Sequence, residues 1–210
     1  MLRFTVLAVT LALVACGGSA PGPSGPTAAT VAAQSSDVPA GMVRCDLSGD
    51  IDGFLNKQKT SDPSTYQSTK KEWDDARAQG ATAAEVVIFT DSKAHCDAVK
   101  TSATDLGAAT YKLVINFVIQ FKDQASATKA YTDETVFNIS AGTLRGRPGV
   151  VEGEKTGLSA NSVVLDTLIA SQRYYIAEWQ NKQFMVILAI LNVDSASARK
   201  VATSENSRIK

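Results

Sequence analysis

Hydrophobic and polar residues alternate most regularly between Tyr111 and Phe121. Every second position in this stretch is large and apolar: Tyr111, Leu113, Ile115, Phe117, Ile119 and Phe121. The positions between them carry lysine, valine, asparagine and glutamine. This alternation predicts a strand with one face on the core and the other largely in water, as in an antiparallel sheet.

Further β-prone runs cluster near the C-terminal end: Val163–Ala170, Arg173–Trp179 and Gln183–Leu191. They are joined by the short segments 171–172 and 180–182, which favours an antiparallel meander. Phe184–Leu191 contains no polar residue and therefore predicts a central strand. Ala84–Phe89 adds another short β-prone run.

Apolar residues at helical spacing predict five helices, which begin at Asp50, Asp62, Asp91-Ser92, Asp123 and Asp194. The second is expected to stop at Gly80 and the third by Gly107. The inward-facing residues are expected to be Ile51, Phe54, Leu55, Gln58, Tyr66, Thr69, Trp73, Ala76, Cys96, Val99, Ala103, Ala127, Ala130, Tyr131, Phe137, Ala198, Val201 and Ala202. These elements predict an α+β fold with an antiparallel sheet of four to six strands and helices packed on one face.

Residues 140–162 form a long connection rich in glycine and charge. Long connections in compact domains are usually functional or mobile. We expect residues 141–160 to border the recognition surface, with Arg145 and Arg147 contacting an acidic group and Glu152 and Glu154 beside them. A mobile connection without a role is the alternative.

The first residues have the organisation of a secretory signal. Arg3 supplies a positive charge, and Phe4–Val14 is an apolar run of 11 residues, too short for the roughly 20 residues that cross a bilayer. Leu13-Val14-Ala15-Cys16 fits the lipobox pattern, in which a small residue precedes an obligatory cysteine.

This stretch resembles the signals of bacterial lipoproteins that are processed by lipoprotein signal peptidase. The resemblance covers residues 1–16 and implies that residues 1–15 are removed. It also implies a thioether-linked diacylglycerol on Cys16 and a further acyl chain, such as palmitate, on its amine. Two or more chains anchor a protein stably on the extracytoplasmic face of a membrane. An ordinary signal followed by a chance cysteine is the alternative.

Residues 17–40 are dominated by Gly, Pro, Ala, Ser and Thr, with no aromatic residue. Such a composition predicts a disordered tether from residue 16 to residue 40. Its 24 residues after Cys16 would have an end-to-end distance of roughly 25–30 Å. A single folded domain is then expected over residues 41–210.

Net charge and cysteine content indicate which kinds of partner to exclude and which cysteines form a disulfide. The chain has 21 basic and 21 acidic residues, and removal of residues 1–15 takes away only Arg3. The resulting net charge near −1 argues against a nucleic-acid partner. Outside the cytoplasm, Cys45 and Cys96 are expected to form a disulfide, with two free buried thiols as the alternative. The bridge would close a loop of about 52 residues and stabilise the fold by roughly 4 kcal/mol.

No motif predicts catalysis, a metal site or a cofactor. His95, the single histidine, lies beside Cys96, but adjacent residues on a helix point in different directions. Asp50, Asp52 and Gly53 suit a calcium loop that begins at Ser48, yet Lys59 stands where that loop needs glutamate.

Two other patterns are weak. Residues 145–148 resemble an AT-hook core, on the wrong side of the membrane, and could instead form a weak anion site. The pairs Asp74-Asp75 and Glu152/Glu154 are interpreted as surface charges.

The order of the C-terminal elements is similar to that of small extracytoplasmic sensor-like lipoprotein domains of bacteria. We therefore expect a non-catalytic, membrane-tethered binding or sensor module with an unidentified protein or small-molecule partner. A carrier that holds an apolar ligand between sheet and helices is one alternative. A hydrolase with an unrecognised carboxylate site is the other.

Overall fold

The structure is a computed structural model that describes residues 25–101, 109–134 and 141–210. In chain order its elements are α1 (Ala28–Val31), β1 (Val43–Arg44), β2 (Gly49–Asp50), α2 (Ile51–Ser61), α3 (Pro63–Ala78), β3 (Ala81–Thr90), α4 (Lys93–Val99), β4 (Leu113–Phe121), α5 (Gln124–Asp133), α6 (Ala141–Leu144), β5 (Val150–Glu152), the 3-10 helix η2 (Gly153–Thr156), β6 (Asn161–Ile169), β7 (Gln172–Asn181), β8 (Phe184–Leu191) and α7 (Ser195–Arg208). The predicted α+β class is confirmed.

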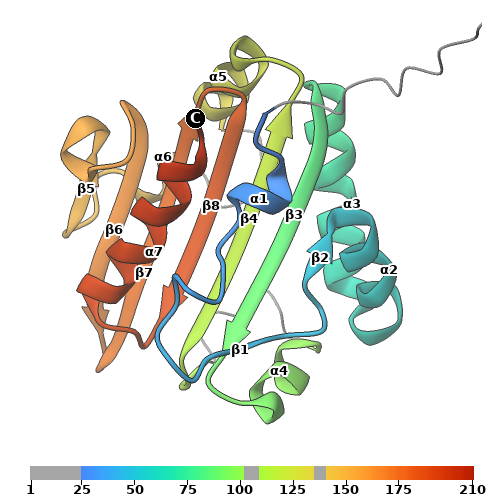
Figure 1. The fold of residues 1–210 in the computed structure, drawn as a ribbon, viewed down its shortest axis with the longest axis vertical. Coiled ribbons are helices and arrows are strands. Elements are labelled where there is room, and N and C mark those ends of the chain that lie inside the picture. Colours follow the sequence, from blue (N-terminus) through green and yellow to red (C-terminus); the bar gives the residue numbers. More distant parts are fainter. Residues whose placement is uncertain (1–24, 102–108, 135–140) are drawn as a thin grey trace, which may run out of the picture.

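One antiparallel sheet organises these elements (Figure 1). Its eight strands run in the order β1-β3-β4-β8-β7-β6-β5, and β2 also pairs with β3. The predicted four to six strands are therefore too few. The additional strands β1, β2 and β5 are two or three residues long, too short for any alternation to reveal them.

The middle of the sheet is buried on both faces. Every residue of β8 is buried, as its unbroken apolar sequence predicts, and β8 lies between β4 and β7. The second face of β4 is not wet as expected, because Val114, Asn116 and Val118 are all 0% exposed. Both faces of the sheet consequently need a covering layer.

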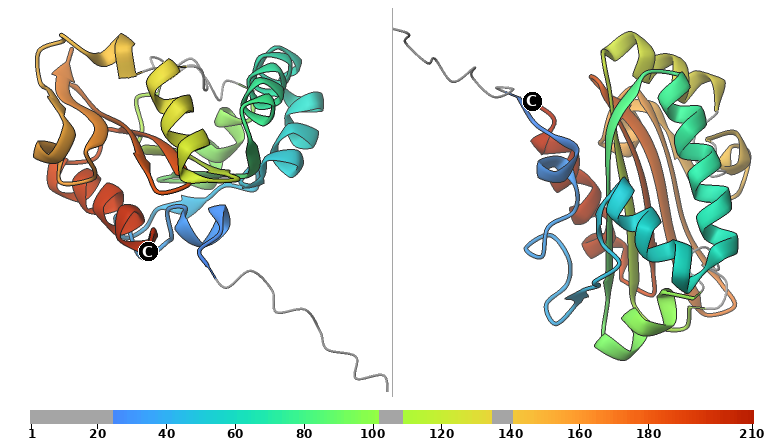
Figure 2. Two further views of the ribbon diagram at one scale, coloured as in Figure 1. Left: turned by 90° about the horizontal axis from the view of Figure 1, so that it is seen from above. Right: turned by 90° about the vertical axis from the view of Figure 1, so that its right-hand side faces the viewer.

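Helices supply a layer on each face (Figure 2). Helices α2 to α6 enclose one core, and α1 and α7 enclose a second core on the opposite face. The prediction of helices on one face only is therefore wrong. The physical reason is that Trp179 and Phe184, which are both 0% exposed, would otherwise lie in water.

Acidic N-caps start the helices where the sequence predicts them. The side chains of Asp62, Asp123 and Asp194 accept backbone N–H bonds at 3.1, 2.7 and 2.9 Å, respectively. Gly80, with φ of +101°, follows the end of α3 as expected. Helix α4 ends at Val99; Ala103, Gly107 and Phe137 lie outside the described residues.

Residues 27–38, which we call the strap, pack on the sheet rather than forming part of a tether. Thr27 caps α1, and the side chains at Ala28, Val31, Ala32, Ala33 and Val38 are buried in the second core. Small apolar side chains allow this close approach, so a segment without aromatic residues still buries its surface. The folded unit begins earlier than the predicted boundary at Gly41. Residues 1–24, with Cys16, lie outside the described residues.

A disulfide joins Cys45 to Cys96, the pairing that the cysteine count predicts. The two Cα atoms are 5.2 Å apart. The bridge ties α4 to the chain between β1 and β2, on the face that carries the first core.

Candidate functional site

The predicted recognition connection is folded rather than open. Within residues 140–162 the chain forms α6, β5 and η2, and β5 pairs antiparallel with β6. The four residues singled out from the sequence, Arg145, Arg147, Glu152 and Glu154, are all exposed on this edge of the molecule.

Arg145 is already engaged by two carboxylates. Its Nη1 lies 2.8 Å from Glu134 Oε1, and its Nε lies 3.2 Å from Glu152 Oε2. This arrangement does not favour the predicted contact of Arg145 with an acidic partner. Arg147 donates from Nε to the Thr143 carbonyl at 2.8 Å and forms no ion pair within the described residues.

Gly142 allows α6 to approach this cluster closely. A Cβ atom at position 142 would overlap the carboxylate of Glu134. Glu134 itself has a left-handed backbone with φ of 54° at the end of α5. The carboxylate of Glu134 is thus held between α5 and α6.

Glu178 of β7 lies beneath the cluster and is 0% exposed. Burial, and after it the nearby Glu134, raise the pKa of its carboxyl to about 8, even though Arg145 partly offsets both effects. The Ala141 amide is close enough to lower this pKa, but neither carboxylate oxygen makes a well-formed hydrogen bond to a described residue. Glu178 therefore carries a proton at neutral pH.

Tyr131 of α5 completes the buried side of the cluster. Burial, followed by the negative charge that Glu178 can carry, raises the pKa of the Tyr131 phenol to about 12. The phenol thus remains protonated at any physiological pH. We call Tyr131, Glu134, Arg145, Glu152 and Glu178 the arginine cluster.

The arginine cluster resembles an acid–base site in composition but not in access. Glu134 and Glu152 are bound to Arg145, and Glu178 is shielded from solvent. A glycosidase needs two carboxyl groups that flank the scissile bond. Within this cluster no such pair is open to a substrate.

The other patterns noted in the sequence are occupied by structural contacts. His95 stacks on Tyr111 with ring centroids 4.0 Å apart and bonds through Nδ1 to Asp91, while Cys96 belongs to the disulfide. A thiol–imidazole pair is therefore not formed.

Asp50, which the calcium-loop pattern includes, and the acidic pair at residues 74–75 also have local partners. Asp50 accepts the Gly53 N–H at 2.7 Å and caps α2, and Asp74 and Asp75 pair with Lys70 and Lys71. In residues 25–101, 109–134 and 141–210, no three His, Cys, Asp or Glu side chains gather as a metal site would require.

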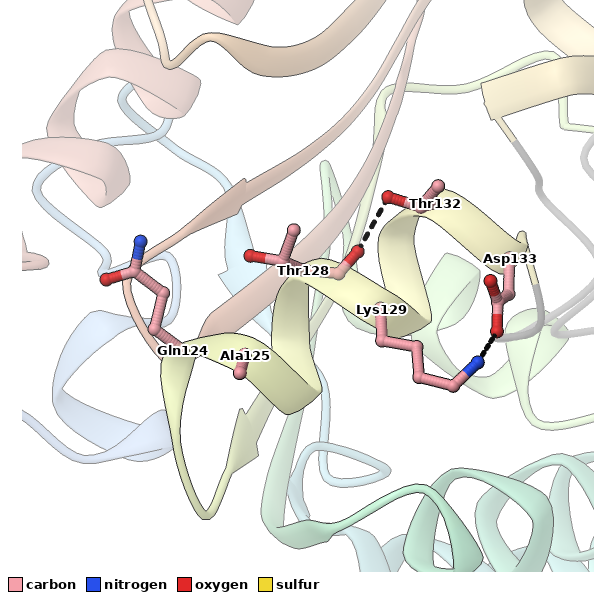
Figure 3. A pocket seen from close by; sticks show the side chains of 6 residues that line it. All are labelled: Gln124, Ala125, Thr128, Lys129, Thr132 and Asp133. Atoms are coloured by element: carbon pink, nitrogen blue, oxygen red, sulfur yellow. Dashed lines mark hydrogen bonds and ion pairs between the residues drawn. The ribbon is translucent and has the colours of Figure 1, made fainter.

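The outer face of α5 forms a shallow hollow (Figure 3). Its lining residues are Gln124, Ala125, Thr128, Lys129, Thr132 and Asp133. Lys129 pairs with Asp133, and Thr132 Oγ1 donates to the Thr128 carbonyl at 2.9 Å. Its charged groups satisfy one another within one helix, so this hollow offers nothing that converges on a ligand.

Comparison with known proteins leaves the family open. No protein-family model matches the chain, and no curated protein matches its sequence. The chain is similar to the crystal structure of the extracellular domain of PknH from Mycobacterium tuberculosis, with 13% identity and a TM-score of 0.44. That match covers 86% of this chain and 93% of the other. No helix in the described part of the chain is long and apolar enough to cross a bilayer.

Proposed function

We propose that this chain is a lipid-anchored extracytoplasmic protein whose folded unit binds a partner or ligand without catalysis. The observation that carries the proposal is the lipobox at Leu13–Cys16 ahead of a disulfide-bonded unit. Structural disulfides persist in oxidising compartments, so the Cys45–Cys96 bridge supports a location outside the cytoplasm.

The anchor would hold the folded unit close to the membrane. Cys16 and Thr27 are 11 residues apart in the sequence, a length that spans at most about 40 Å when fully extended. The tether would thus be shorter than the sequence suggests, because the strap belongs to the folded unit. The end of the molecule at which α1 meets the C-terminal end of α7 would face the lipid surface (Figure 2).

The packing of the molecule favours a surface-binding role over an apolar-ligand carrier or a hydrolase. Both cores are packed with apolar side chains, whereas a carrier would need an apolar cavity of several hundred Å³. The arginine cluster presents no open carboxylate pair for a hydrolase. Recognition would therefore take place on the surface.

Metabolic labelling tests the anchor directly. The full chain is expressed in a bacterial host with an alkyne fatty acid, together with Cys16→Ser and the control Ser19→Ala. We expect label and membrane retention for the wild-type chain and Ser19→Ala, and neither for Cys16→Ser. If Cys16→Ser were labelled and retained like the wild type, the lipid anchor would be excluded.

A binding role is tested by cross-linking in intact cells. A photo-reactive residue is placed at exposed positions around the molecule, and adducts are identified by mass spectrometry. We expect one face to yield a recurring adduct while purified protein shows no turnover of ester, glycoside or phosphate substrates. Turnover that is lost in Glu178→Gln would instead support the hydrolase.

A further inference from the structure

A polar hollow lies between the strap and the outer strands β1 and β3. It encloses about 350 Å³ and is lined by Ala29, Ala33, Gln34, Ser35, Arg44, Glu85, Val87 and Phe89. Four of these residues come from the strap and four from the two strands. We call this site the strap hollow; it lies on the sheet face opposite to the arginine cluster.

The strap wall of the hollow is held rigidly in place. Arg208 of α7 donates to the Val31 and Ala32 carbonyls at 3.0 Å each, and also binds Asp37 at 2.8 Å. The Ala33 N–H donates to Asn116 Oδ1 of β4 at 3.0 Å. These bonds lie outside the hollow, so they fix its wall without filling its interior.

The opposite wall carries an ion pair, Arg44–Glu85, in which only one atom of each side chain is bonded to the other. Arg44 Nη2 lies 3.1 Å from Glu85 Oε1, and the Glu85 side chain is 12% exposed. Burial raises the pKa of the Glu85 carboxyl, and the nearby Arg44 only partly offsets this. No described residue bonds to Glu85 Oε2 or to the other two guanidinium nitrogens, and the Arg44 side chain is 48% exposed, so a ligand in the hollow can reach these groups.

The floor of the hollow is apolar. Val87 and Phe89 of β3 are 2% and 0% exposed and belong to the second core, and Ala33 closes the floor from the strap. The hollow thus combines one positive group, one negative group and a small apolar surface. Its volume of about 350 Å³ is at the low end of the range for ligand pockets and suits a small molecule.

We propose that the strap hollow binds a small zwitterion, of the free amino acid class. The carboxylate of the ligand would accept hydrogen bonds from the guanidinium N–H groups of Arg44 that have no other partner. The ammonium of the ligand would donate to Glu85 Oε2. An ion of one sign would compete with the existing pair and separate the other charge from its partner, which costs most at Glu85, because that side chain is only 12% exposed. A zwitterion supplies both charges, and a short side chain would lie on Val87 and Phe89. The proposal deepens the binding function proposed above and rests on it.

Occupancy would also link the strap to the sheet. A ligand that touches Gln34 or Ser35 on one wall and Arg44 and Glu85 on the other would join the strap to the strands β1 and β3. The strap is the first described segment after the proposed anchor. Binding should therefore slow hydrogen exchange at the strap amides more than elsewhere.

Titration of the full chain in detergent tests the proposal. Each of the twenty standard free amino acids is added up to about 10 mM, which covers the weak end of ligand affinities. We expect at least one to bind by calorimetry and to shift the amide signals of Ala33 and Gln34. Its analogues that lack the amine or the carboxylate should bind at least about tenfold more weakly, as the loss of a charge-assisted hydrogen bond predicts.

Two variants and a matched control complete the test. Glu85→Gln and Arg44→Gln should each weaken binding at least about tenfold. Asp166→Asn alters a comparable ion pair, Arg173–Asp166 at 2.9 Å, on the same face but across the sheet, and should leave binding unchanged.

Each outcome decides between the possibilities. The proposal is overturned if no amino acid binds, if both variants bind like the wild type, or if a one-charge analogue binds equally well. None of these results would affect the lipid labelling of Cys16. Conversely, an unlabelled Cys16 with intact binding would remove the anchor and leave this site standing.

Discussion

Each face of the sheet buries one glutamate, and the two glutamates are surrounded differently. Glu178 points from β7 toward α5 and α6, where Glu134 and Arg145 are its charged neighbours. Glu205 points from α7 toward β4, where Arg208 and Asp37 are the charged neighbours. Both side chains are 0% exposed, and burial is the largest cause of the raised pKa in each.

The contrast lies in what each network connects. Around Glu205, Arg208 and Asp37 tie the strap to the last helix, so this network joins the two ends of the described chain. Around Glu178, Arg145 ties the end of α5 to β5 through the partly exposed carboxylate of Glu134 and the exposed one of Glu152. The first network links the two ends of the described chain, and the second lies at the solvent-exposed edge of the sheet.

Removing the disulfide should have the largest effect and should act on the Glu178 face alone. Cys45→Ala with Cys96→Ala frees a loop of 51 residues, which should lower the free energy of unfolding by about 2–5 kcal/mol. Urea denaturation measures this loss. Strap amides should keep most of their protection from hydrogen exchange, and their loss in step with α4 would show that the two faces are not independent.

The buried glutamates should make the fold less stable at alkaline pH. Glu178 has an ordinary pKa near 4.5 and a folded pKa of about 8, so the folded state holds the proton more tightly. Its contribution is fully present below the unfolded pKa and is lost as pH rises toward 8, at up to about 1.4 kcal/mol per unit and roughly 3 kcal/mol between pH 5 and 8.

Both buried glutamates contribute to this loss. Burial also raises the pKa of the Glu205 carboxyl well above its ordinary value, so the folded state holds that proton more tightly too. Glu178→Gln should therefore flatten the profile between pH 5 and 8, and Glu205→Gln should also reduce the loss of stability with rising pH. Denaturation across pH measures both slopes, and an unchanged slope in either variant would remove that residue from the account.

Releasing the strap should cost less than removing the disulfide. Arg208→Ala deletes the bonds to Asp37 and to two strap carbonyls and leaves the buried Asp37 without its charged partner, for a loss of about 2–3 kcal/mol. Arg208 is partly exposed, which keeps the loss below that of a fully buried pair. Proteolysis should cut within residues 27–38 first, and the control Arg199→Ala on the same helix should resist like the wild type.

The sequence predicted the elements with local signals and missed those that depend on distant partners. Acidic caps and the apolar run 184–191 are local, and they were found. Helix α1 has four residues, too few for a helical period, and the pattern that predicts α7 does not tell which face of the sheet that helix covers.

The spacing of both buried glutamates in the sequence places them on the inward faces of their elements, although their charge suggests exposure. Glu205 follows Val201 and Ala202 on the inward face of α7, and Glu178 shares a face with Tyr174 and Ile176 in β7. Their spacing placed them inside, but a charged residue is normally read as exposed. The cross-chain contacts of Arg145 and Arg208 depend on the tertiary fold and leave no local pattern.

The smallest effects are expected at the two arginines of the predicted recognition edge. Arg145→Gln removes two exposed ion pairs and should cost no more than about 1 kcal/mol, whereas Arg147→Gln should cost less than about 0.5 kcal/mol. Since Arg145 lowers the pKa of Glu178, its loss should raise that pKa, and Arg147→Gln should not. Carboxyl-detected NMR titration of Glu178 distinguishes the variants. If Arg145→Gln and Arg147→Gln shifted the Glu178 titration equally, the pKa of Glu178 would depend on the overall charge of this edge and not on the nearby Arg145. The surface network would then differ from the enclosed one around Glu205 in exposure alone.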